Sequence, residues 1–190
     1  PTRFGFLLIN DFTLISMSSA VEPLRMANRI MNQQVYEWRT ISETGDPVTA
    51  SDGLSVNVDF AISDPQAATG LDAVIVCSGI DVERSTTEPI TRWLKLISGA
   101  GPALGAICTG SYVLGKAGLL DGYRCSVHWE NLASVTDLFP YATVTRGIYT
   151  IDRNRYTSSG GTAPVDMMLH FIARQCGTEV SAGVAEQYVH

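Results

Sequence analysis

Three short, uninterrupted apolar runs constrain the fold of this chain most strongly. They are Phe4–Ile9, Asp72–Cys77, in which five apolar residues follow the aspartate, and Ala103–Ile107. Runs of this kind are typical of central parallel strands that are covered on both faces. Segments with helical spacing of apolar residues separate them, including Ser18–Met31 and a stripe that stops at Gly99. The alternation predicts an α/β fold, in which an open, mostly parallel sheet is flanked by helices on both faces.

The remaining segments extend the same plan. Further strands are expected at Tyr36–Ser42, Ser55–Val58, Tyr123–Val127, Ala142–Val144, Gly147–Ile151 and Arg155–Ser158, the last two as a hairpin that turns at Asp152–Asn154. Further helices are expected from Thr87, near Thr109, from Trp129 to Leu138, from Thr162 to Arg174 and from Val180 to His190.

Size and composition narrow the class of protein. A chain of 190 residues with 45% hydrophobic composition can bury one core, so residues 1–190 are expected to form a single domain. Its net charge of −6 and its lack of a basic run argue against direct binding of nucleic acid. No apolar stretch is long enough for a membrane span, so we expect a soluble, cytoplasmic protein. The cysteines and histidines lack metal-ligand spacing, so neither a metal nor another cofactor is expected.

A cysteine occupies the point where a buried strand turns directly into a helix. The strand Ala103–Ile107 is followed by Cys108 and by a helix that starts near Thr109. Such an elbow holds the side chain above the sheet, where the helix N–H groups can stabilise a thiolate or the carboxylate of a ligand. The alternative interpretation is that Cys108 is a small buried apolar residue, as free cysteines usually are.

Four loops should meet at the carboxyl edge of the sheet, where ligands bind in folds of this class. They are Asn10–Ser16, Ser78–Gly79, Cys108–Thr109 and His128–Trp129. A thiol, a histidine and free N–H groups near Gly79 and Thr109 are the parts of a nucleophile with its base and oxyanion hole. The histidine would need an orienting carboxylate, for which Glu130, Asp11 and Glu22 are candidates and none is compelling.

The residues around the cysteine also resemble a known family. The segments Ala106–Ser111 and Ala117–Gly122, followed by His128, resemble the elbow and histidine region of the class I glutamine amidotransferase-like superfamily, of the PfpI type. This resemblance implies a flavodoxin-like sheet.

A second set of segments narrows the resemblance. Ser158–Leu169 resembles a signature of those superfamily members that are fused to an AraC-type DNA-binding domain. Phe4–Leu8 and Ser19–Asn28 are similar to the same regulators, particularly those that sense arginine, glycine betaine, carnitine and related amines. The resemblance covers nearly the whole chain.

One position departs from the enzymes of this superfamily. In isocyanide hydratases and related enzymes the loop after the first strand carries an acidic residue beside the cysteine, and that position falls on Ser16 in this chain. A hydroxyl cannot replace a carboxylate as a general acid or base, but it can still hold a ligand by hydrogen bonds. The alternative role of Ser16 is to cap the first helix.

The other site candidates also have structural alternatives. His128 could be a core histidine rather than a pocket residue, and Trp129 could pack in the core rather than offer a ring face to a cation together with Phe12 or Tyr112. Carboxylates such as Glu130 could balance a positive ligand or simply be solvated. The complete set of ligand-binding candidates is Asp11, Phe12, Ser16, Ser78, Gly79, Cys108, Thr109, His128, Trp129 and Glu130.

The resemblance implies that this chain is the effector-binding domain of an AraC-family transcription regulator. Its small-molecule effector would be an amine or amino-acid-like metabolite of the arginine, betaine or carnitine type. Contact with DNA would be made only by a helix-turn-helix domain expected beyond residue 190, and a homodimer is expected by analogy. Catalytic roles are not assigned to Cys108 and His128. The alternatives are a cysteine-dependent hydrolase or hydratase of the PfpI type and an inert dimerisation module.

Overall fold

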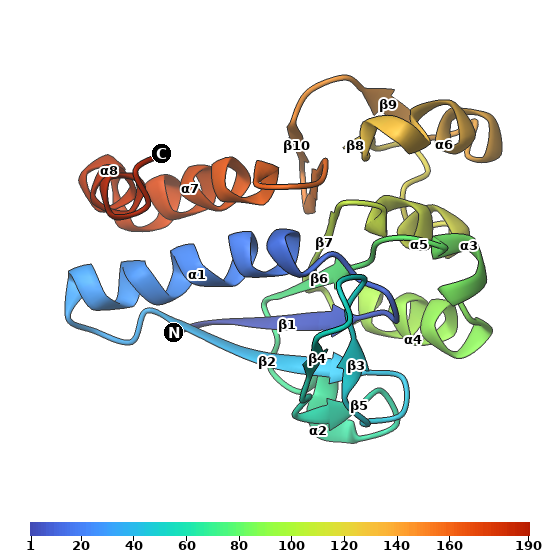
Figure 1. Cartoon of the computed structure of the whole chain (residues 1–190), viewed down its shortest axis with the longest axis horizontal. Helices are drawn as coiled ribbons and strands as arrows, with labels where there is room; N and C mark the ends of the chain where they lie inside the picture. Colours follow the sequence, from blue (N-terminus) through green and yellow to red (C-terminus); the bar gives the residue numbers. More distant parts are fainter.

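A seven-stranded sheet forms the centre of the molecule in a computed structural model that describes residues 1–190 (Figure 1). Its strand order is β10-β11-β7-β6-β1-β2-β5, and every neighbouring pair is parallel except β10 and β11. The strands are β1 (Thr2–Leu8), β2 (Tyr36–Ser42), β5 (Phe60–Ala61), β6 (Ala73–Cys77), β7 (Ala103–Ile107), β10 (Tyr149–Asp152) and β11 (Arg155–Ser158). The predicted open, mostly parallel sheet is confirmed, including the hairpin of β10 and β11.

Helices cover both faces of this sheet. On one face α1 (Leu14–Met31), α7 (Ala163–Cys176) and α8 (Thr178–Gln187) pack together, as Figure 1 shows. The other helices are α2 (Pro65–Ala68), α3 (Val82–Ser85), α4 (Glu88–Ser98), α5 (Gly110–Lys116) and α6 (Leu132–Leu138), which the 3₁₀ turn η1 (Trp129–Asn131) precedes. None of the helices combines the length and the apolar character needed to cross a membrane.

Two hydrophobic cores result, one on each side of the sheet. Because side chains alternate along a strand, Phe6 of β1 packs in the core beneath α1 and α7, whereas its neighbour Leu7 packs in the core with α4 and α5. Both residues have no exposed surface. This double burial explains why the central strands have continuous apolar sequences.

Two small sheets lie outside the central one. One pairs β3 (Val48–Thr49) with β4 (Ser55–Val56), and the other pairs β8 (Arg124–Ser126) with β9 (Thr143–Thr145). The sequence predicts that the strand before His128 is one more strand that ends at the carboxyl edge of the main sheet. The structure corrects this expectation, because the only strand that pairs with β8 is β9.

Helix boundaries differ from the predicted ones at several ends. The first helix begins at Leu14 rather than at Ser18, so Ser16 lies within it and is completely buried. The segment after His128 begins as a 3₁₀ turn before it becomes α6. The short elements α2, α3, β3 and β5 were not predicted, because two to four residues are too few to show a period.

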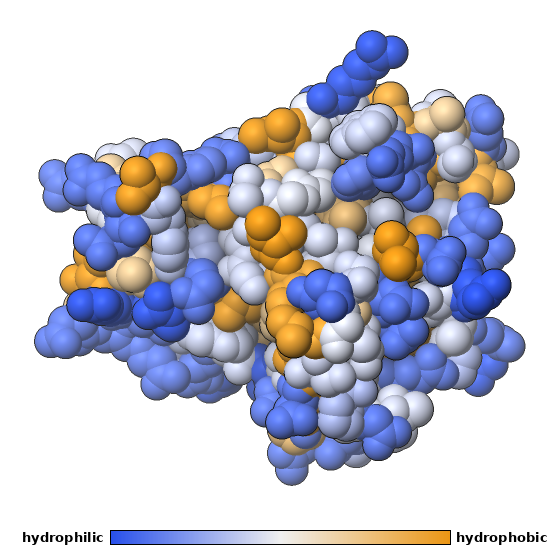
Figure 2. All heavy atoms as spheres, in the orientation of Figure 1, coloured by the Kyte–Doolittle hydropathy of each residue, from blue (hydrophilic) through white to orange (hydrophobic).

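The outer surface carries apolar side chains in scattered positions. Figure 2 shows separate apolar groups in the middle of one face, divided and bordered by polar residues. Ile15, Leu54 and Ile80 are each more than half exposed. Scattered exposed apolar residues are usual in globular proteins and do not mark a binding surface by themselves.

Candidate functional site

The predicted elbow is present at the end of β7. Cys108 has a φ of 57°, in the left-handed region that few residues with a side chain adopt. Only 5% of its surface is exposed. Gly110, at the start of α5, passes close to β6, where a Cβ atom would lie 2.5 Å from the carbonyl oxygen of Val76. The glycine therefore allows the helix to begin directly against the sheet.

Two hydrogen-bonding groups face the thiol. The Thr13 Oγ1 lies 3.4 Å from the Cys108 Sγ. Burial raises the pKa of the Cys108 thiol, and the nearby Glu130 carboxylate also raises it, whereas hydrogen bonds from Thr13 and from the Thr109 N–H lower it. The net shift is upward, so the thiol is held mainly in its protonated, poorly nucleophilic form.

His128 reaches the same edge by a backbone contact. Its N–H donates to the carbonyl oxygen of Cys108 at 3.2 Å. The ring Nδ1 accepts from the N–H of Glu130 at 3.3 Å, so the neutral ring carries its proton on Nε2. In this tautomer Nε2 is a donor and does not serve as a base for the thiol. No hydrogen bond joins the His128 ring to the Cys108 Sγ.

The loop after β11 completes the contact between these two residues. A Cβ atom at Gly160 would lie 3.1 Å from the His128 Nε2 and 3.2 Å from the Cys108 Sγ, and closer still to the His128 Cδ2. Gly160 therefore packs closely against both the ring and the thiol, in a position that has no room for a side chain. This glycine lies in the family signature Ser158–Leu169 but is not among the site residues predicted from the sequence.

Ser16 is buried beside the site rather than in it. Its Oγ donates to the carbonyl oxygen of Gly161 at 3.0 Å, and it has no exposed surface. It does not cap α1, which begins two residues earlier and has Thr13 at its N-cap position. The hydroxyl at the position that is acidic in related enzymes therefore fastens α1 to the loop before α7.

A cleft of about 650 Å³ opens above the elbow. Five of the predicted ligand-binding residues line it, namely Gly79, Cys108, Thr109, His128 and Glu130. Seven further lining residues were not predicted, namely Thr13, Ile80, Asp81, Val82, Glu83, Arg84 and Asn131. The segment 80–84 was missed because its helix, α3, has only four residues and carries no motif.

The loops that form this cleft are tied together by short polar contacts. The Thr109 Oγ1 donates to the carbonyl oxygen of Gly79 at 2.6 Å. A Cβ atom at Gly79 would overlap the carbonyl oxygen of Asp11, so only glycine allows this approach of the loops after β1 and β6. The N–H group of Gly79 donates no hydrogen bond within the protein.

The other five predicted residues do not line the cleft. Phe12 and Ser16 are completely buried, and Ser78 is 1% exposed with a hydroxyl that has no partner. The Asp11 carboxylate accepts from the side-chain amide of Asn10, and the backbone N–H of Asp11 donates to the carbonyl oxygen of Thr49. Trp129 is 74% exposed and stacks on the His128 ring at 5.8 Å between centroids.

The aromatic cage considered for a cationic ligand is therefore not assembled. Phe12 is in the core, and Tyr112 is only 8% exposed, with its ring edge-on to Phe139 at 5.6 Å. Neither ring faces the cleft. Negative charge is supplied instead by three carboxylates of the lining, Asp81, Glu83 and Glu130, against one cation, Arg84.

Comparison with known proteins identifies the family. The family model described as "DJ-1/PfpI family" matches residues 5–174, most of the chain. The chain belongs to the DJ-1/PfpI family. The match confirms the resemblance to PfpI-type proteins that the elbow and histidine segments indicated.

Named relatives and a solved structure extend this result. The HTH-type transcriptional regulator GbdR of Pseudomonas aeruginosa is 50% identical over 190 residues, which are 100% of this chain and 51% of that protein. The crystal structure of an AraC family transcriptional regulator from Pseudomonas putida has a TM-score of 0.90 and 30% identity, and the match covers 99% of this chain and 100% of that chain. The isonitrile hydratase of Pseudomonas putida is 27% identical over 183 residues, 94% of this chain and 74% of that enzyme. The chain thus spans about half the length of the curated regulator that it matches.

Proposed function

We propose that this chain is the effector-binding domain of an AraC-type transcription regulator. The proposal is supported by its 50% identity to about half of an HTH-type regulator and by the fold that it shares with an AraC family regulator. DNA would be contacted by a helix-turn-helix region elsewhere in the full protein, because this domain has a net charge of −6 and no basic run. Such a regulator would act in the cytoplasm as a homodimer.

The environment of Cys108 favours binding over catalysis. The position that would supply a general acid or base holds Ser16, whose hydroxyl is engaged with the Gly161 carbonyl. The thiol has a raised pKa, and His128 presents a proton rather than a lone pair at Nε2. The cleft retains the volume for a small molecule, within the usual range of about 300 to 1,000 Å³ for ligand sites.

The charges of the cleft indicate the chemistry of the effector. Asp81, Glu83 and Glu130 would hold a cationic group, while Arg84 and the free N–H groups of the Gly79 loop would hold a carboxylate. A small amine or amino-acid-like metabolite of the arginine, betaine or carnitine type carries both kinds of group. Binding would regulate transcription only if it favours one arrangement of the DNA-binding region over another.

A thermal-shift screen of this domain tests the proposal. Arginine, glycine betaine, carnitine, other amino acids and polyamines are the panel. At a hundredfold excess over its Kd, a ligand stabilises the folded state by about 2.7 kcal/mol, which is readily measured. Stabilisation should be lost in Glu83→Gln and kept in Glu179→Gln, since Glu179 is on α8 away from the cleft. No response to any compound, or equal responses in the two variants, would reject the amine-sensor proposal.

A cysteine-dependent hydratase or hydrolase is the second candidate. It is favoured by the left-handed Cys108 elbow and by the 27% identity to an isonitrile hydratase. This alternative requires turnover of an isonitrile or a related substrate that disappears in Cys108→Ala. The sensor proposal requires stabilisation by an unchanged ligand, with no product detected by mass spectrometry.

A further inference from the structure

The unit that carries His128 is not part of the main sheet. Residues 124–145 contain β8, η1, α6 and β9. β8 and β9 pair with each other as strands, but neither pairs with a strand of the seven-stranded sheet. In a continuous sheet the ladder of backbone hydrogen bonds fixes where each strand ends. The His128 N–H donates to the Cys108 carbonyl oxygen at 3.2 Å. Because no ladder supports this single bond, other contacts must fix the strand that leads to His128.

Ser126, two residues before His128, is held from three directions. Its N–H donates to the Thr157 Oγ1 on β11 at 2.8 Å, and its carbonyl oxygen accepts from the Ser111 Oγ on α5 at 2.7 Å. Its own Oγ lies 2.6 Å from the Thr150 Oγ1 on β10. Ser126, Thr157 and Ser111 have no exposed surface. Every polar group of Ser126 is thus engaged by a side chain from another element.

The hydroxyl contacts close into a ring. Thr145 of β9 lies 2.7 Å from Thr150 and 3.2 Å from Ser126, in each case between the hydroxyl oxygens. Three hydroxyl groups, each with one proton and two lone pairs, can satisfy one another in this arrangement. Apolar side chains of similar size would also fill the space, but they would allow the two sheets to slide, whereas directional hydrogen bonds specify one position.

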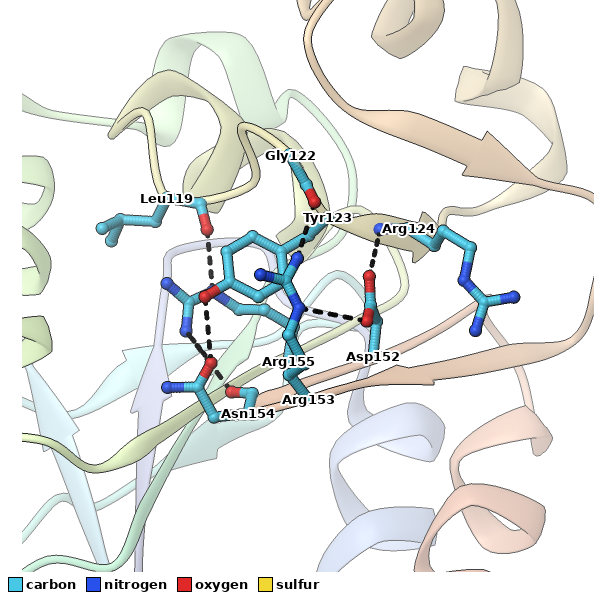
Figure 3. A network of polar contacts seen from close by, with 8 residues as sticks. All are labelled: Leu119, Gly122, Tyr123, Arg124, Asp152, Arg153, Asn154 and Arg155. Carbon is cyan, nitrogen blue, oxygen red and sulfur yellow. Dashed lines mark hydrogen bonds and ion pairs between the residues drawn. The ribbon is translucent and has the colours of Figure 1, made fainter.

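A second set of contacts fastens the start of the same strand. Figure 3 shows the ring of Tyr123 between the guanidinium groups of Arg153 and Arg155. Their Cζ atoms lie 3.8 Å and 4.3 Å from the ring centroid, respectively. Arg155 also donates to the carbonyl oxygen of Leu119 at 2.7 Å, and the Asp152 carboxylate accepts from the Arg124 N–H at 2.8 Å. The hairpin β10–β11 therefore holds β8 at its first residue.

Both strands lead from these contacts to the cleft. The chain reaches His128 two residues after Ser126, and it reaches Gly160 three residues after Thr157. Gly160 packs closely against both the His128 ring and the Cys108 thiol. At this contact even one added carbon atom would overlap His128. A small shift of β8 along β11 would therefore move the His128 ring relative to Gly160 and change the shape of the cleft that His128 lines.

We propose that Ser126, through its hydroxyl ring with Thr145 and Thr150 and its bond to Thr157, is the positioning residue that sets His128 against Cys108. The proposal deepens the proposed function, since His128 lines the cleft that would receive the effector. Its test uses no effector, so its outcome is separate from that of the ligand screen.

Alkylation of Cys108 by iodoacetamide measures the position of His128 in the chain alone. Peptide mass mapping follows Cys108 separately from Cys176, which is partly exposed, whereas the other cysteines are buried. Thr157→Val keeps the shape of the side chain but removes the acceptor of the Ser126 N–H. The β8 unit should loosen and admit water to the thiol, so alkylation should be about threefold faster, equivalent to a fall of half a unit in the thiol pKa. Thr157→Ser, which keeps the hydroxyl, should restore the wild-type rate.

Two controls separate positioning from general loss of stability. Thr143→Val changes an exposed threonine of β9 and should leave the rate unchanged. Leu24→Ala removes apolar contacts in the core on the opposite side of the sheet from α5, so it should lower the Tm. Below the Tm it should also leave the alkylation rate of Cys108 unchanged. If Thr157→Val does not fold, Ser126→Ala, which loses only one oxygen, is measured instead. A wild-type rate in these cluster variants, or an equal increase in Leu24→Ala, would overturn the proposal.

Discussion

The Thr13 hydroxyl lies 3.4 Å from the Cys108 thiol, although 95 residues separate them in the sequence. Thr13 occupies the N-cap position of α1, but its side chain makes no capping hydrogen bond. Its hydroxyl is therefore available to the thiol, and its replacement does not remove a helix cap.

Thr13→Val is expected to slow alkylation of Cys108. Because the hydroxyl stabilises the thiolate, its loss should raise the pKa of Cys108 further and reduce the thiolate fraction at neutral pH, by about tenfold for each pKa unit. The rate of reaction with iodoacetamide as a function of pH measures this shift. Thr91→Val, on the exposed side of α4, is the matched control. An unchanged pH profile in Thr13→Val would show that the contact does not influence the thiol.

Gly160→Ala is expected to displace the His128 ring without preventing folding. The added methyl group would overlap the ring and press on the Cys108 Sγ, at a cost of about 1–3 kcal/mol in the free energy of unfolding. Denaturant unfolding measures the loss, and the NMR signals of the His128 ring report the displacement. Gly99→Ala should change stability by less than about 0.5 kcal/mol, since its new methyl group meets nothing closer than 3.5 Å. Equal effects at the two glycines would contradict this prediction.

The parts of the fold that were predictable have strong local signals. Tyr36–Ser42 and Ala103–Ile107 have the bounds expected from sequence, and α4 begins after Thr87 as its cap and proline pattern indicates. In these segments apolar periodicity and turn residues specify the element without help from distant residues. The loops after the central strands therefore met at one edge as expected.

The site was less predictable because its contacts depend on segments far apart in the chain. The Ser16 hydroxyl contacts Gly161, and the Thr13 hydroxyl contacts Cys108. No local sequence pattern indicates either contact. The apolar pattern also did not show that β8 lies outside the main sheet, because a strand of three residues fits a position inside or outside it equally well. Five predicted residues consequently lie outside the cleft, while α3 supplies lining residues that no motif marks.

Asp152→Asn is expected to change the acid sensitivity of the hairpin that holds β8. The Arg124 N–H and then the Arg153 side chain hold the pKa of Asp152 below its usual value. A carboxyl group whose pKa is lower in the folded state stabilises that state at neutral pH, and this contribution is lost as the pH falls through the folded-state pKa. The difference in stability between wild type and variant should therefore shrink during acid titration. A difference that stays constant with pH would contradict the assignment.

Ser16→Asp tests whether the acidic residue of related enzymes can simply be restored. The new carboxylate would be buried against the Gly161 carbonyl oxygen, an acceptor, so the folded protein should lose about 1–3 kcal/mol at neutral pH. A protonated carboxyl group can donate to that carbonyl, so the pKa of the new residue should be higher in the folded state than in the unfolded state. Its destabilising effect should then grow as the pH rises and fade in acid, as pH-dependent denaturation would measure.

Ser18→Asp, on a less buried part of α1, is the matched control for added charge and should show little of this pH dependence. The same variants separate sensing from catalysis. Because the Gly161 carbonyl and the Nε2 proton of His128 remain in place, a carboxylate at residue 16 alone does not recreate an acid–base pair for Cys108. Ser16→Asp should therefore show no turnover of an isonitrile. Turnover in a stable Ser16→Asp protein would instead mean that the cleft retains the remaining machinery of an enzyme and that one hydroxyl separates the two functions.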